Sequence, residues 1–118
     1  MLPFAFILGC GVKPTKIFIF KETSNEVFYS VEVWEESGAI SSDFTRVFAN
    51  VNTDGKIDKQ LVLDGPYLLV KRIKWDGKRG NVLCLSEGRV NSFRKEVTLN
   101  ADGKAYVVRT FLDYNCST

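Results

Sequence analysis

Apolar and polar residues alternate with a period of two along much of the chain. The clearest case is the run 27–34, which would place on one face Val27, Tyr29, Val31 and Val33. This period is that of a β-strand with one buried face. No helical period of useful length is found after the first eleven residues. The pattern therefore predicts an all-β protein.

Turn signals separate the apolar runs. Asp-Gly pairs begin at Asp54, Asp64, Asp76 and Asp102. Asp-Gly between apolar runs favours a tight hairpin, because both residues tolerate the positive φ that such turns need. With the softer signals at 22–26, 36–38 and 86–89, they divide the chain into runs predicted as strands: 15–20, 27–34, 40–49, 57–63, 67–75, 81–86, 90–99 and 105–114.

Consecutive strands joined by short turns must bury one face and protect two edges. An antiparallel up-and-down β-barrel of the calycin type does both, and is the predicted fold. A β-sandwich is the alternative. A chain of 118 residues suits one domain. We expect a single β-barrel domain over 1–118, in which the apolar segment 1–12 is a remnant helix or strand.

Composition excludes several classes of function. The sequence has no histidine, so Ser-His and Cys-His catalysis are excluded, and no nucleophile with a plausible base is visible. The oxygen-rich stretch 50–58 lacks the glutamate that a calcium loop needs at its twelfth position, which is Leu61. We therefore expect no enzyme activity, no catalytic residue, no metal and no cofactor.

The basic run between Lys71 and Arg79 does not predict nucleic-acid binding. In a strand, Lys71 would share a face with Trp75, while Arg72 and Lys74 would share the other, so the charges are divided. The net charge of +2 is also small for a polyanion partner. No nucleic-acid partner is expected.

The cysteines bear on the cellular compartment. Cys10, Cys84 and Cys116 are odd in number and widely separated, which favours reduced thiols in a cytoplasmic protein. The alternative is secretion, with "MLPFAFILGC" as a leader, although no basic residue precedes its apolar run. This segment is too short to span a bilayer, so stable membrane insertion is not expected.

The last predicted strand holds the most informative cation. Alternation places Arg109 on the face of Val107 and Phe111. A guanidinium among apolar neighbours needs a partner, which a ligand carboxylate could supply inside a barrel. In the alternative, Arg109 faces solvent and the opposite face, which includes Tyr106 and Val108, packs inward. Alternation alone leaves both open.

The order of these segments resembles the intracellular lipid-binding proteins, the family of fatty-acid-binding and cellular retinoid-binding proteins. The similar stretches are "KPTKIFIF" at 13–20, "LVLDGPYLLVKRIKWDGK" at 61–78 and "VVRTF" at 107–111. The family's first strand and most of its helical lid have no counterpart. Its second carboxylate-binding arginine would fall near Leu85 or Ser86.

The resemblance implies noncatalytic binding and transport of a fatty acid or similar hydrophobic molecule in the barrel interior. It would make Arg109 the carboxylate anchor, with Phe111 and Val107 as adjacent wall and Trp75 as a further ligand-binding residue. An edge-strand dimer is expected as a second kind of partner. The alternative function is that of a secreted, lipocalin-like or β-sandwich protein-interaction module.

Overall fold

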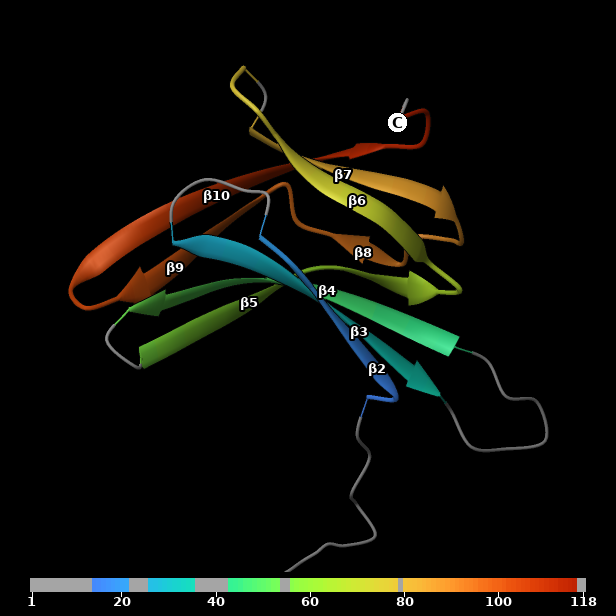
Figure 1. Cartoon of the computed structure of the whole chain (residues 1–118), viewed down its shortest axis with the longest axis horizontal. Coiled ribbons are helices and arrows are strands. Elements are labelled where there is room, and N and C mark those ends of the chain that lie inside the picture. The colour runs from blue at the N-terminus through green and yellow to red at the C-terminus, as the bar shows by residue number, and fades with distance from the viewer. Residues whose placement is uncertain (1–13, 22–25, 36–42, 54–55, 79, 117–118) are drawn as a thin grey trace, which may run out of the picture.

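A computed structural model describes residues 14–21, 26–35, 43–53, 56–78 and 80–116. In these ranges the chain forms strands and turns, arranged as two sheets (Figure 1). The prediction of an all-β protein is confirmed. The sheets are not closed into a barrel, and this arrangement agrees with the alternative of a β-sandwich.

The larger sheet is antiparallel and has five strands in the order β2-β3-β4-β5-β8. Their bounds are β2 Lys16–Phe20, β3 Val27–Glu35, β4 Asp43–Thr53, β5 Lys56–Pro66 and β8 Ser92–Phe93. The strand β2 lies at the edge, where the side chains of Ile17, Phe18 and Ile19 are each about half exposed. The apolar side chains of β2 are therefore accessible at an edge that no other described strand covers.

The smaller sheet has four strands in the order β6-β7-β10-β9. Their bounds are β6 Leu69–Asp76, β7 Gly80–Glu87, β9 Glu96–Ala101 and β10 Lys104–Asp113. The strands β7 and β10 pair in parallel, from Thr110 opposite Asn81 to Asp113 opposite Cys84. In the predicted up-and-down fold, each strand pairs in antiparallel with its neighbours in the sequence. The parallel pairing of β7 with β10 therefore differs from the predicted fold.

The space between the sheets is filled by side chains. Its largest fully buried members come from both sheets and include Tyr29, Leu63, Ile73, Leu83 and Leu99. These side chains form one hydrophobic core that joins the two sheets.

The predicted strands agree with the observed ones to within a few residues, with one exception. The run 90–99 is divided between β8 and β9. Because Thr110 donates its N–H to the carbonyl of Lys95, the chain has passed to the second sheet before β9 begins. The break therefore carries the chain from one sheet to the other.

Two of the Asp-Gly turns are confirmed, at Asp76 and Asp102, whereas Asp54 and Gly55 lie outside the described residues. The turn predicted at Asp64 is wrong, because this residue and Gly65 belong to β5. A Cβ atom on Gly65 would stand 1.8 Å from the carbonyl oxygen of Arg89. This glycine is needed for a close approach of two backbones rather than for a turn.

A disulfide joins Cys84 in β7 to Cys116 after β10, with their Cα atoms 5.7 Å apart. The prediction of reduced thiols is wrong for this pair. The two residues are 32 positions apart in the sequence and meet because β7 and β10 are neighbours. Cys10 lies outside the described residues.

No helix in the described part of the chain is long and apolar enough to cross a membrane.

Candidate binding groove

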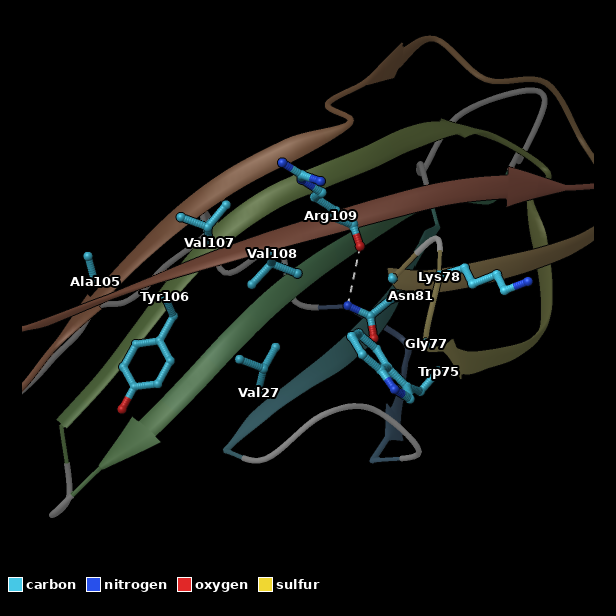
Figure 2. A pocket seen from close by; sticks show the side chains of 11 residues that line it. Val27, Trp75, Gly77, Lys78, Asn81, Ala105, Tyr106, Val107, Val108 and Arg109 are labelled. Carbon is cyan, nitrogen blue, oxygen red and sulfur yellow. Dashed lines mark hydrogen bonds between the residues drawn. The ribbon is translucent and has the colours of Figure 1, made fainter.

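A groove of about 560 Å³ lies between the β6–β7 hairpin and the first half of β10 (Figure 2). It is lined by Val27 of β3, by Trp75, Gly77, Lys78, Gly80 and Asn81 of the hairpin, and by residues 105–109 of β10. We call it the edge groove. Its volume falls within the range of about 300–1,000 Å³ that small-molecule sites commonly have.

The edge groove follows the edge of β10 rather than one of its faces. Five consecutive residues of this strand line it, and consecutive side chains in a strand point to opposite faces. Val108 is buried against the core, whereas Val107 is 60% exposed on the other face. Figure 2 shows Val107 and Arg109 on the opposite side of β10 from Tyr106 and Val108.

Backbone polar groups of β10 face the groove. Thr110 donates its N–H to the carbonyl of Lys95 over a distance of 2.9 Å, on the side of β9. The side alternates with each residue of a strand, so the N–H and C=O of Val107 point the other way, toward β7. Pairing with β7 begins at Thr110. No described strand covers the earlier part of this edge, as Figure 1 also shows.

The groove ends where β7 begins, at Gly80. This glycine has a φ of 106°, a conformation that other residues rarely adopt, and it turns the chain into β7. A Cβ atom there would come within 3.2 Å of the carbonyl oxygen of Arg109. The close approach brings β7 against β10 at this point, while the hairpin preceding it leaves the groove open.

Asn81 is the most buried polar residue of the groove, with 3% of its surface exposed. Its Nδ2 donates to the carbonyl oxygen of Arg109 over 3.3 Å, drawn as the dashed line in Figure 2. Because a carbonyl needs a donor, this contact fixes the orientation of the amide. The buried Oδ1 of Asn81 has no hydrogen-bond partner. Asn81 thus keeps a buried acceptor without a donor beside this end of the groove.

Tyr29 lies near Asn81 in the core, whereas Tyr106 lies toward the other end of the groove, near Ala105. The hydroxyls of Tyr29 and Thr110 are hydrogen-bonded at 2.6 Å. Burial raises the pKa of Tyr29 from 10.0 to about 12, and hydrogen bonds with Thr110 and Asn81 oppose part of this rise. Desolvation, together with the carboxylates of Glu26 and Asp102, raises the pKa of Tyr106. Both phenols are therefore uncharged at neutral pH.

Three of the four predicted ligand-binding residues line the edge groove: Trp75, Val107 and Arg109. Phe111 does not line it, and its half-buried ring lies instead beneath the ammonium of Lys95, 5.6 Å from the ring centroid. The structure therefore brings most of the predicted residues together at the surface, outside the core.

Arg109 does not point into the interior. Its side chain is 68% exposed, and its Nε lies 3.5 Å from Oε2 of Glu96. The alternative in which Tyr106 and Val108 face inward is the one observed. An ion pair as exposed as this one contributes little to stability. Arg109 thus lies at the rim of the groove, which Lys78 also lines, and no carboxylate is among the described lining residues.

Sequence reasoning did not identify Val27, Lys78, Asn81 and Tyr106 as groove residues. Asn81 carried a usable signal, because it is a polar residue directly before the apolar run 82–85. No sequence signal marked Val27, Lys78 or Tyr106, because their proximity depends on how the two sheets are placed relative to each other. Within the described ranges, no three side chains of His, Cys, Asp or Glu are grouped as a metal site would require.

Comparison of the chain with protein-family models, curated proteins and solved structures finds no match.

Proposed function

We propose that the protein is a noncatalytic binding protein that holds a small hydrophobic acid, such as a fatty acid, in the edge groove. The observation that carries this proposal is the joint lining of one groove by Trp75, Val107 and Arg109. Trp75 and Val107 offer apolar surface that is 51% and 60% exposed. Arg109 and Lys78 offer positive charge at its rim.

A ligand that covers these side chains gains the free energy of removing apolar surface from water, about 25 cal/mol for each Å². A carboxylate at the rim gains a charge-assisted hydrogen bond from a guanidinium. Neither interaction requires a chemical step. The proposed function is therefore binding and transport.

Titration with dodecanoate, followed by calorimetry, tests this proposal. Val107→Asp should weaken binding at least tenfold, because it places a carboxylate in the groove. Ile57→Asp is the matched control, since Ile57 is 63% exposed on β5 and does not line the groove. Equal losses in the two variants would contradict the proposal.

The role of Arg109 is tested by comparing dodecanoate with dodecanol. Arg109→Ala should weaken binding of dodecanoate by roughly three- to tenfold, the equivalent of one hydrogen bond, and leave dodecanol unchanged. Equal effects on the two ligands would exclude Arg109 as a carboxylate anchor.

The disulfide favours an oxidising compartment for this function. Bonds such as Cys84–Cys116 persist in secreted and periplasmic proteins and are rare in the cytosol. We therefore propose secretion, in place of the cytoplasmic location expected from the sequence. Alkylation of the protein isolated from its own host, followed by mass spectrometry, should find Cys84 and Cys116 unmodified before reduction. Alkylation of both would place the protein in a reducing compartment.

A further inference from the structure

The edge of β10 beside the groove carries backbone groups that no described strand satisfies. The N–H and C=O of Val107 face the groove, as do those of Ala105, while β7 pairs with β10 from Thr110 onward. Unpaired strand edges are templates on which another extended chain can form hydrogen bonds. A hydrocarbon chain offers these groups no partner, whereas a peptide offers one amide for each residue.

The shape of the groove fits an added strand. A strand placed beside β10 lies in the plane of the sheet and presents side chains to both of its faces. The groove provides apolar contacts for both, with Val107 on one side and Val27 and Tyr106 on the other. Residues 105–109 would pair with four or five ligand residues, at about 3.3 Å for each.

Charge sets the direction of the ligand. Arg109 and Lys78 lie at the end of the groove toward which β10 runs, and no acidic residue lines the groove. A ligand parallel to β10 places its terminal carboxylate at these cations, just where β7 begins. Asn81 lies at the same end, where its Nδ2 donates to the carbonyl oxygen of Arg109. The free edge of β10 therefore calls for amide partners, and the two cations call for a terminal carboxylate.

We propose that the edge groove binds the carboxyl-terminal end of an extended hydrophobic peptide, which pairs in parallel with β10. This inference rests on the proposed function and narrows its hydrophobic acid to a peptide terminus. The peptide continues the row of β7 along the uncovered half of β10, and its carboxylate is held by Lys78 and Arg109.

Three peptides and one fatty acid test the inference on the complete protein. The first is acetyl-Thr-Val-Thr-Val with a free carboxyl terminus. The second has a terminal amide in place of the carboxylate, and the third carries N-methyl groups on alternate residues that remove its donors to β10. Dodecanoate is the fourth probe. Affinities come from calorimetry, and the contact site comes from amide chemical shifts of the labelled protein.

We expect the free peptide to bind and to shift the amide resonances of Ala105 and Val107. Terminal amidation and N-methylation should each weaken binding about tenfold, as the loss of a charge-assisted bond or of a backbone pair predicts. N-methylation that leaves the affinity unchanged would overturn the strand-pairing arrangement. Amidation that leaves it unchanged would overturn the carboxyl-terminal orientation.

A backbone variant tests the edge directly. Val107→Pro removes the N–H that faces the groove and spares the bonds to β9, because proline is tolerated where a strand's N–H lies at a free edge. It should weaken the peptide roughly tenfold, whereas the matched control Val107→Thr retains the N–H and should change the affinity little. Equal affinities for these two folded variants would overturn the inference.

The inference and the proposed function fail in different ways. Dodecanoate binding in the groove without peptide binding would overturn the inference and retain the proposed function. A protein that binds neither dodecanoate nor the free peptide would overturn both.

Discussion

The phenol oxygen of Tyr29 lies 2.6 Å from Oγ1 of Thr110, and this hydrogen bond joins β3 to β10 across the core. Both residues are buried, with 0% and 1% of their surfaces exposed. A buried polar pair that is fully satisfied favours one arrangement of the elements it connects. The bond therefore helps to fix the position of β10, one wall of the edge groove, relative to the other sheet.

The coupling between these two hydroxyls is measurable. Tyr29→Phe and Thr110→Val should each lower the free energy of unfolding by about 1–3 kcal/mol, because each leaves a buried hydroxyl with fewer partners. The double variant should lose about 1 kcal/mol less than the sum, since it removes both groups. Urea unfolding of the four proteins gives this value. Strictly additive losses would show that the hydroxyls act independently.

The raised pKa of Tyr29 predicts a loss of stability at alkaline pH. The folded protein favours the neutral phenol up to about pH 12, whereas the unfolded chain ionises near the usual value of 10.0. The resulting stabilisation, roughly 2–3 kcal/mol, is present in full below pH 10. It is lost as the pH rises from 10 to about 12.

Urea unfolding of the wild type and Tyr29→Phe across this pH range isolates that contribution. The variant should lose less stability than the wild type as the pH rises. Tyr114→Phe, which alters an exposed tyrosine, is the control and should follow the wild type. If Tyr29→Phe also follows the wild type, Tyr29 does not titrate differently in the folded state.

The disulfide should contribute substantially to stability. Closing a loop between residues 32 positions apart lowers the entropy of the unfolded chain, which corresponds to about 3–4 kcal/mol. Cys84→Ala combined with Cys116→Ala should lower the free energy of unfolding by about this amount. The wild type treated with a reductant should show a similar decrease. Unchanged stability in both would indicate that the bond does not constrain the chain.

The close approach at Gly65 predicts a large steric effect. Gly65→Ala places a methyl group 1.8 Å from a backbone oxygen of Arg89, so the segment that follows β7 must move. We expect a loss of more than about 2 kcal/mol. The control is Gly77→Ala, whose added methyl group meets no atom within 4 Å. Thermal unfolding compares the two, and similar melting temperatures would contradict the described packing.

Local pattern was sufficient to predict most strands and insufficient to predict how they assemble. Alternation correctly grouped Val107 with Arg109, and Tyr106 with Val108, but it does not state which group faces the core. That choice depends on the second sheet, which a period of two does not encode. Val107 and Arg109 lie on the exposed face of β10 rather than toward the core, and their role in binding stays a prediction.

Two further differences between the sequence predictions and the structure arise from contacts between distant parts of the chain. The parallel pairing of Thr110 with Asn81 joins strands that are not consecutive, and no local turn signal marks such a contact. It also brings Cys84 and Cys116 together, although their spacing in the sequence indicated no partnership. Asp64 and Gly65 show the converse case, in which a strong local turn signal is overridden because the glycine serves a contact with a distant segment.

The parallel pairing of β7 with β10 also influences the order in which strand pairs form during folding. Hairpins such as β3–β4 and β6–β7 form between neighbouring segments, whereas β7 must wait for a strand that arrives later in the chain, and such distant pairings form slowly. Cys84 stands opposite Asp113 in this ladder, so Cys116 reaches it once β10 has docked in that register. Oxidation of the two thiols would therefore mark the completion of folding, and its rate would measure how quickly β10 pairs with β7.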